Sequence, residues 1–258
     1  LADDLGLPTW ATSEVAEYAP ERSLTVRADD HTGRVIAYVK LYAAGTVDVG
    51  RFADRYERAG AALRGAPLVA VPQVLGRTDT AIAISPMPGV TWTRARGDAA
   101  VVLGRLGAAI AHFHDTPADG LAAPFGRLQV PRVVHSAELV GDARPELAPA
   151  LRLVADRLAA GPPPGDRQVL LHGDCHPKNS LVDGPRLALI DLDQAGTGSA
   201  ACDLASLLAR LHHGAILGET DATEADRLGA AFLAGYATVR ALPPAASLRW
   251  HYAAALVA

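Results

Sequence analysis

The first 84 residues alternate between apolar and polar positions in a pattern that predicts a small sheet with one helix. Two β-branched runs flank a polar turn that ends in Gly33, which is typical of a β-hairpin. The residues after this hairpin place Phe52, Tyr56, Ala59 and Leu63 at helical spacing. The predicted strands are 13–18, 23–28, 34–42, 69–75 and 80–84, and the predicted helix is 47–64.

The pattern changes after Ser85-Pro86-Met87-Pro88-Gly89, a cluster of breaker residues that we interpret as a hinge. Beyond it the apolar positions recur mostly with the helical period, and Asp98 is the expected N-cap of the first helix. The predicted helices are 98–114, 147–160, 201–213 and a helical region over 222–257, with short strands at 169–171, 180–182 and 187–192. The chain is therefore predicted to be α+β, with a β-rich N-lobe (1–84), a hinge (85–89) and a larger, mainly helical C-lobe (90–258).

Composition narrows the function classes. A formal net charge of −4 disfavours binding to nucleic acid or an anionic membrane, and no apolar run approaches the length of a membrane span. Two cysteines and the lack of an export leader at Leu1 favour a reducing, cytoplasmic location. Of the 24 basic residues, only Lys40 and Lys178 are lysines. In a chain with this bias, a retained lysine is a candidate for specific chemistry.

The segment around Asp183-Gly184-Pro185 gathers the side chains most suited to catalysis. If its flanking strands pair as a hairpin, Asn179 and Asp191 lie opposite one another, and their oxygens suit Mg²⁺. Asp174, on the loop before this hairpin, could accept a proton from a hydroxyl nucleophile. Phosphoryl transfer from a nucleotide also needs a cation on the phosphates, and Lys40 in the small lobe is well placed for it. A charge within an apolar strand needs a partner, and the following helix offers Glu57 or Asp54.

The motif His172-Gly173-Asp174-x-His176-x-x-Asn179, followed by Ile190-Asp191-Leu192-Asp193, resembles that of the aminoglycoside phosphotransferase and choline kinase superfamily. The resemblance covers most of the chain and implies a protein-kinase-like bilobal fold with the nucleotide in the cleft between the lobes. It implies that Asp174 is the catalytic base, that Asn179 and Asp191 bind Mg²⁺, and that Lys40 holds the α/β-phosphates. Glu57 would pair with that lysine, and Asp203 would brace the catalytic loop.

The hinge supports an expectation about the nucleotide. Pro86 and Pro88 have no N–H, so Met87 is the sole donor between positions 86 and 88. We therefore expect the Met87 N–H and the Ser85 carbonyl to contact adenine. The predicted activity is an ATP- and Mg²⁺-dependent transfer of phosphate to a hydroxyl of a small polar acceptor, with GTP left open as the donor. An aminoglycoside-like antibiotic, an amino alcohol and a sugar are all candidate acceptors. The oligomeric state is left open.

Two features of the sequence indicate functions other than phosphoryl transfer. The segment Glu17–Ser23 contains no glycine where kinases often place a flexible phosphate loop, which motivates a nucleotide-binding pseudokinase without turnover as the alternative. His172, Asp174 and His176 could also form part of a metal hydrolase site, although no further ligand pair is spaced to complete a zinc site. Four acids at 219, 221, 224 and 226 could attract a cationic acceptor, or could be an ordinary solvated helix start.

Overall fold

The computed structural model describes residues 1–63, 68–95, 97–115, 126–163 and 167–257, which form two compact units. The first unit holds residues 1–89 and 183–193, and the second holds residues 90–182 and 194–258. The boundary at Gly89 coincides with the end of the predicted hinge. The segment 183–193 groups with the first unit, whereas the sequence division placed it in the second. No helix among the described residues combines the length and the apolar character that a membrane span requires.

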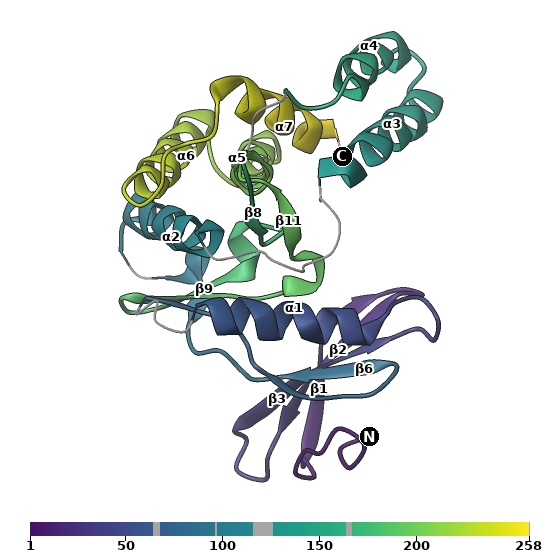
Figure 1. The fold of residues 1–258 in the computed structure, drawn as a ribbon, viewed down its shortest axis with the longest axis vertical. Coiled ribbons are helices and arrows are strands. Elements are labelled where there is room, and N and C mark those ends of the chain that lie inside the picture. The colour runs from purple at the N-terminus through teal and green to yellow at the C-terminus, as the bar shows by residue number, and fades with distance from the viewer. Residues whose placement is uncertain (64–67, 96, 116–125, 164–166, 258) are drawn as a thin grey trace. The chain divides into compact units, whose positions relative to one another are not determined.

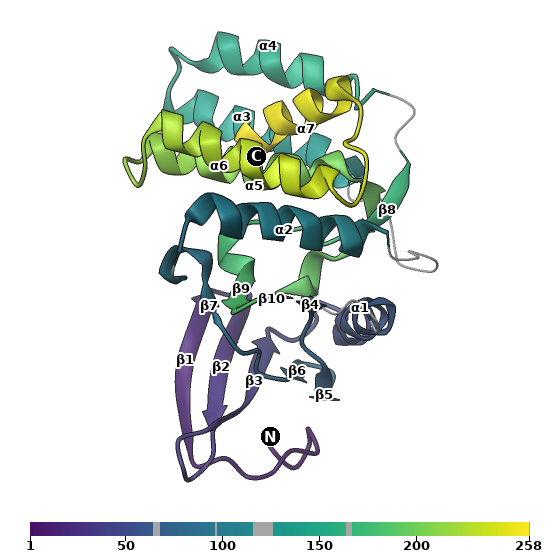
Figure 2. The ribbon, with the colours of Figure 1, turned by 90° about the vertical axis from the view of Figure 1, so that its left-hand side faces the viewer.

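The first unit is built on a five-stranded sheet with the order β1-β2-β3-β6-β5. Its strands are β1 (Thr12–Ala19), β2 (Ser23–Asp29), β3 (Val35–Tyr42), β5 (Val74–Arg77) and β6 (Ala81–Ile84). Helix α1 (Val49–Ala62) packs against β5 and β6 (Figure 2). Each neighbouring pair of strands is antiparallel, and β2 and β3 pair as the sequence predicted, with Thr25 opposite Lys40. The small apolar residues Ala28, Ala37 and Ala83 form the core of this sheet together with Val39 and Leu5.

The predicted run 69–75 divides into two elements. Residues Val69–Ala70 form β4, which pairs in parallel with β10 (Arg186–Leu189), and the chain then enters β5. This parallel pairing, together with a hydrogen bond from the Leu187 N–H to the Leu68 carbonyl, ties the late segment to the first unit. It is the physical reason that 183–193 does not group with the residues around it in sequence.

The second unit is a stack of helices. Helix α2 packs on α6, α6 on α5, α5 on α7, α7 on α3 and α3 on α4 (Figure 2). Their bounds are α2 (Ala99–His114), α3 (Gly126–Ala143), α4 (Ala148–Ala159), α5 (Ala201–Ile216), α6 (Ala222–Ala237) and α7 (Ala245–Val257). Figure 1 shows α3 and α4 as a neighbouring pair of helices. As predicted, Asp98 caps α2, because its carboxylate accepts a hydrogen bond from the Ala100 N–H at 2.9 Å.

Short strands of the second unit flank the segment that carries the His-Gly-Asp motif. Strand β8 (Gln168–Leu171) pairs with β11 (Gly196–Ser199), and β7 (Val90–Thr91) pairs with β9 (Ser180–Asp183). The motif therefore leaves a buried strand at Leu171 and enters another at Ser180. The remaining short elements are 3-10 helices, namely η1 (Trp92–Arg94), η2 (Pro177–Asn179) and η3 (Leu192–Gln194).

Three differences from the sequence prediction have local causes. Helix α3 was not predicted, since Pro131 interrupts its pattern, yet it forms with the proline inside. The single helical region over 222–257 is two helices, which separate before Pro243 and Pro244. Strand β11 was not predicted either, because its sequence Gly-Thr-Gly-Ser has weak strand propensity and is held by pairing with β8.

Helices α2 and α6 approach so closely that glycine is required between them. A Cβ at position 107 would lie 2.0 Å from the carbonyl oxygen of Phe232, and one at position 235 would lie 1.8 Å from that of Gly104. We expect Gly107→Ala to lower the free energy of unfolding by about 3 kcal/mol, because the helices must separate to admit the methyl group. Urea unfolding measures this effect.

The matched control is Gly60→Ala in α1, where the nearest atom to the new methyl group is a Val71 methyl carbon at 3.7 Å. This helical glycine has room, so alanine there should raise the free energy of unfolding by about 0.5–1 kcal/mol. Equal effects of the two substitutions would contradict the close helix contact.

Candidate active site

Lys40 is a buried cation held by two carboxylates. It lies on β3 with 8% of its surface exposed, and its Nζ is 2.5 Å from Asp191 and 3.1 Å from Asp193. Burial alone would lower the pKa of Lys40, but the two carboxylates outweigh it and raise that pKa above its ordinary value. Lys40 is therefore charged throughout the neutral range.

Asp193 is held by two tyrosines and an arginine in addition to Lys40. Its two side-chain oxygens accept hydrogen bonds from the hydroxyls of Tyr42 at 2.7 Å and Tyr56 at 3.1 Å, and the guanidinium of Arg55 donates to its carbonyl. The Tyr56 hydroxyl also accepts a hydrogen bond from the Leu192 N–H at 3.1 Å. Burial, followed by the nearby carboxylate of Asp193, raises the pKa of both tyrosines, so they remain neutral donors.

Asp191 occupies an unusual backbone conformation. Its φ is +63°, in the left-handed region that non-glycine residues rarely adopt. Aspartate tolerates this region better than most residues, and such positions concentrate at functional sites. The bonds that Tyr56 and Arg55 make to the next two residues hold the chain in this turn. One carboxylate oxygen of Asp191 accepts a hydrogen bond from the Lys40 ammonium group, and the other oxygen can bind a ligand.

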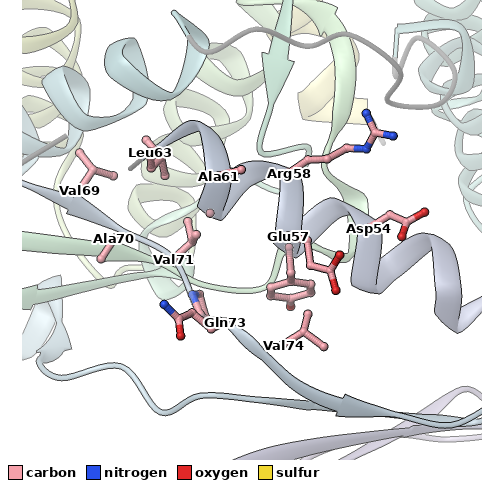
Figure 3. Close-up of a pocket in the computed structure, with 13 residues that line it drawn as sticks. Asp54, Glu57, Arg58, Ala61, Leu63, Val69, Ala70, Val71, Gln73 and Val74 are labelled. Atoms are coloured by element: carbon pink, nitrogen blue, oxygen red, sulfur yellow. The ribbon is translucent and has the colours of Figure 1, made fainter. Parts of the chain in front are cut away.

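The ion pair expected between Lys40 and Glu57 is not formed among the described residues. Helix α1 turns Tyr56 inward to full burial, and Glu57, one position further along the helix, is exposed. Asp54, the other candidate, lies 4.0 Å from Arg77. Figure 3 shows Asp54, Glu57 and Arg58 projecting from α1 at a cavity of about 850 Å³, whose other wall includes Gln73 and Val74. Lys40 is instead paired with Asp191 and Asp193, which lie far along the sequence.

In the second unit, Asp203 braces the loop that carries the motif. Its carboxylate accepts hydrogen bonds from the N–H groups of His172 at 2.7 Å and Gly173 at 3.0 Å. The buried His114 side chain bridges Asp203 and the Tyr236 hydroxyl, with both contacts at 3.0 Å. The bracing role expected for Asp203 is therefore confirmed.

Glycine at 173 is required by two constraints. Its φ is +83°, and a Cβ there would lie 2.0 Å from the carbonyl oxygen of Gln194. The loop thus passes directly against the chain at Gln194, and the next residue, Asp174, leaves this contact in a fixed direction. The sequence order His-Gly-Asp reflects this geometry.

Asp174 is partly buried and bonded to its own loop. The Asn179 side-chain amide donates to the Asp174 carboxylate and to its carbonyl, both at 3.1 Å, and His176 Nε2 lies 3.6 Å from the carboxylate. Burial opposes ionisation, but His176, His172 and Asn179 outweigh it and lower the pKa of Asp174. The group is an ionised carboxylate at neutral pH. Since the Asn179 nitrogen is committed to Asp174, its amide oxygen can face a cation.

The donor atoms of Asn179 and Asp191 fit the hard cation that the sequence predicts. Both are oxygens, which is the ligand type that Mg²⁺ takes from proteins alongside phosphate and water. Among the described residues there is no group of three or more His, Cys, Asp or Glu that could hold a metal. Oxygen donors of this kind suit Mg²⁺ shared with phosphates better than zinc, whose protein sites favour Cys and His ligands.

The hinge residues belong to the first unit and have free backbone groups. The Ser85 N–H donates to the Gln73 carbonyl at 2.8 Å, and the Ser85 hydroxyl accepts from the Gln73 N–H at 2.9 Å. Within the described part of the chain, the Ser85 carbonyl and the Met87 N–H have no hydrogen-bond partner. They can therefore serve as the acceptor and donor that were expected for adenine.

The glycine-free turn between β1 and β2 is tight. It spans residues 20–22, and Glu21 adopts a φ of +59° where a glycine would be the ordinary choice. The Arg22 N–H closes the turn on the Ala19 carbonyl at 3.1 Å. A strained, closed turn thus stands in the place of the flexible loop that is common in kinases.

Several residues that orient the site could not be identified from the sequence. Tyr42 and Tyr56 look like core positions of an amphipathic strand and helix, and nothing in their spacing marks the hydroxyls as ligands of Asp193. Arg55 looks like a solvated helix charge. His114 carried a weak signal, because a histidine at an apolar position in α2 needs a buried partner, which is Asp203.

A family model described as the phosphotransferase enzyme family matches residues 21–242. A comparison with curated proteins gives no match. Among solved structures, the macrolide 2'-phosphotransferase of Brachybacterium faecium is 23% identical with a TM-score of 0.61, and the match covers 94% of this chain and 82% of that one.

Two further structures contain ADP and an antibiotic. A spectinomycin phosphotransferase in complex with ADP and spectinomycin has a TM-score of 0.67 at 14% identity, with 97% of this chain and 80% of that chain covered. A Streptomyces rimosus aminoglycoside phosphotransferase in complex with ADP and streptomycin has a TM-score of 0.58 at 18% identity, with 95% and 92% covered. The chain therefore has the kinase-like fold of these phosphotransferases, in agreement with the α+β prediction.

Proposed function

Because the chain belongs to the phosphotransferase enzyme family, we propose that it transfers the γ-phosphoryl group of ATP to a hydroxyl of a small molecule. The observation that carries this proposal is the state of Asp174. It is an ionised carboxylate, fixed by Asn179 and by the braced loop, at the motif position where a hydroxyl would be deprotonated. We further propose that Lys40 and Asp191 act on the same bound nucleotide.

Asp174 would orient the acceptor hydroxyl and take up its proton as the oxygen attacks phosphorus. A carboxylate with a lowered pKa is a weak base, so its main contribution is position, with proton uptake late in the reaction. The Asn179 amide keeps the carboxylate from rotating, since it bonds both the side chain and the backbone of Asp174.

The cation Lys40 would bind the α/β-phosphates, and Asp191 and Asn179 would hold Mg²⁺. When bound, Mg²⁺ neutralises charge on the phosphates. In the described structure Lys40 is engaged by Asp191 and Asp193, so nucleotide phosphate would compete with these carboxylates for the ammonium group. The bonds from Tyr42 and Tyr56 let Asp193 keep partners when Lys40 turns to phosphate.

The hinge groups support a purine nucleotide. The Met87 N–H can donate to a ring nitrogen, and the Ser85 carbonyl can accept from the exocyclic amine of adenine. Guanine presents a carbonyl at that position, so the Ser85 carbonyl favours ATP over GTP. The closed, glycine-free turn at residues 20–22 motivates the nucleotide-binding alternative without turnover, whereas the ionised Asp174 carboxylate favours an active enzyme.

The experiment that tests the function is an acceptor panel incubated with Mg-ATP. The panel contains macrolides, aminoglycosides, amino alcohols and sugars, and mass spectrometry reads each acceptor. The proposal predicts a gain of one phosphoryl group on at least one acceptor, matched by ADP formation. If calorimetry finds no binding of Mg-ATP and no acceptor gains mass, the proposal is refuted.

The pH dependence follows from the lowered pKa of Asp174. A base with a lowered pKa is already ionised above its ordinary value near 4, so Asp174 should cause no loss of kcat between about pH 5 and 8. His176→Ala removes the leading cause of the lowering and leaves burial to act, which raises this pKa. We therefore expect the variant to lose kcat at a higher pH than the parent on acidification. A pH profile of kcat in which both proteins fall at the same pH would contradict this assignment.

Lys40→Arg should impair nucleotide use although the charge is kept. The position is buried between two carboxylates and a tyrosine, and a planar guanidinium cannot replace a compact ammonium in that space. We expect kcat/KM for ATP to fall about 100-fold. The companion is Lys178→Arg, at the only other lysine, which is exposed on the η2 turn and should change kcat/KM for ATP less than about threefold. Similar losses in both variants would contradict a special role for Lys40.

A further inference from the structure

The second unit contains a cavity of about 430 Å³ beside the catalytic loop. Its walls come from the segment around Trp92, from the loop at His176–Lys178, and from the end of α5 and the start of α6. Its size suits a small molecule. His176 both lines the cavity and lies 3.6 Å from the Asp174 carboxylate, which links the cavity to the proposed base.

From the lining of this cavity we infer that the acceptor is an amphiphilic alcohol with a broad apolar face and a single positive charge, not a polycation. The inference rests on the proposed function and deepens it. Two independent observations support it. One is the set of apolar side chains on the cavity wall, and the other is the set of lining charges that have no ion pair with a described residue.

The apolar wall is formed by Trp92, Leu211, Leu217 and Leu228. Leu211 and Leu228 are buried behind the wall, whereas Leu217 keeps 60% of its surface exposed at the end of α5. Apolar side chains left open next to a cavity indicate a ligand that covers them. A densely hydroxylated and aminated molecule would lose hydration against the three leucines of this wall, which offer it no hydrogen bonds.

Most of the acidic residues at positions 219, 221, 224 and 226 already have a hydrogen-bond partner or line another cavity. Asp221 caps α6, since its carboxylate accepts from the Glu224 N–H at 2.8 Å. Glu224 makes two hydrogen bonds with Arg227, at 2.7 and 2.9 Å. Asp226 lines a different cavity, so it is not available at this one.

Glu219 is therefore the one lining carboxylate that, within the described part of the chain, has no ion pair or side-chain hydrogen bond. Two cations, Lys178 and Arg210, line the same cavity and have no ion pair with any described residue. Among the lining charges without an ion pair in the described part of the chain, two are positive and one is negative, which disfavours a molecule with several ammonium groups. One ammonium beside Glu219 is the arrangement that this balance permits.

The test compares two antibiotics with opposite chemistry. Erythromycin is a macrolide with one tertiary amine, and gentamicin is an aminoglycoside with several amines. Calorimetry measures their binding with Mg-ADP present, and a coupled assay measures kcat/KM with Mg-ATP. We expect erythromycin to bind and to be used at least tenfold better. Preference for gentamicin, or failure of erythromycin to bind the Mg-ADP complex, would overturn the inference while leaving the proposed phosphotransferase intact.

Substitutions then assign the preference to the cavity. Glu219→Gln should raise KM for erythromycin about 3–5-fold with kcat unchanged, which is the scale of a partly exposed ion pair. Leu217→Asp should lower kcat/KM for erythromycin about tenfold and raise that for gentamicin. The matched control is Asp142→Asn, which removes an exposed carboxylate of α3 outside the cavity and should change neither value. A KM for erythromycin that is the same in Glu219→Gln and in the parent would also overturn the inference.

Discussion

Replacement of Asp174 by asparagine is expected to lower kcat about 1,000-fold while the protein stays folded and binds Mg-ATP. The substitution keeps the size of the side chain and removes its ability to take a proton. It also removes the negative charge that, in the proposed mechanism, would orient the attacking hydroxyl. Because the loop is fixed by Asp203 and Gly173 through backbone contacts, its path should survive the change.

The matched control for this prediction is Asp183→Asn. Asp183 is exposed at the end of β9 and makes no ion pair with a described residue, so the same chemical change there should leave kcat within about twofold. Single-turnover kinetics with saturating Mg-ATP and acceptor measure the chemical step. A chemical step in Asp174→Asn within tenfold of the parent would remove Asp174 from its proposed role.

Asp191→Asn should lower kcat 100- to 1,000-fold and weaken metal binding. In the proposed site Asp191 would supply a charged oxygen for Mg²⁺, and it is one of the two carboxylates on Lys40, so the substitution would disturb both the metal and the lysine proposed to bind phosphate. The left-handed backbone at this position tolerates asparagine as well as aspartate. The effect should therefore be chemical and not a loss of fold.

A measurement independent of turnover separates these contributions. Electron paramagnetic resonance of Mn²⁺ with ADP reports how tightly the metal binds, and Asp191→Asn should weaken it at least tenfold, whereas Asp183→Asn should not. Thermal melting without nucleotide should show a small change, because Lys40 keeps Asp193 as a partner at 3.1 Å. Unchanged Mn²⁺ affinity in Asp191→Asn would contradict its assignment as a ligand.

Much of the fold could be predicted because hydrophobic periodicity is local. The hairpin of β2 and β3, the helices α1 and α2, and the break at Gly89 all follow from residues close in sequence. Helix α3 escaped prediction because a proline within a helix is tolerated where tertiary packing against α4 and α7 compensates. The placement of 183–193 in the first unit depends on pairing with β4, over a hundred residues away, which periodicity cannot reveal.

The candidate site divides in the same way. Asp174, Asn179 and Asp191 could be identified because the motif compresses them into one segment with fixed spacing. The ion-pair partner of Lys40 could not be identified from the sequence, because it depends on how far helix α1 is rotated about its own axis. The observed rotation buries Tyr56 and leaves Glu57, about 100° further round the helix, exposed, and the carboxylates of Asp191 and Asp193 pair with the lysine instead. Tyr42 and Tyr56 gain their role only from this packing.

Phosphorus-31 NMR of the reaction with Mg-ATP and the best acceptor of the panel tests the central claim most directly, because it identifies the bond that forms. We predict a phosphomonoester resonance coupled to the proton on the acceptor's carbinol carbon, growing in step with ADP and lost in Asp174→Asn. Accumulation of ADP with inorganic phosphate alone, or an ester signal that forms equally fast in Asp174→Asn, would contradict transfer to a hydroxyl oriented by this carboxylate.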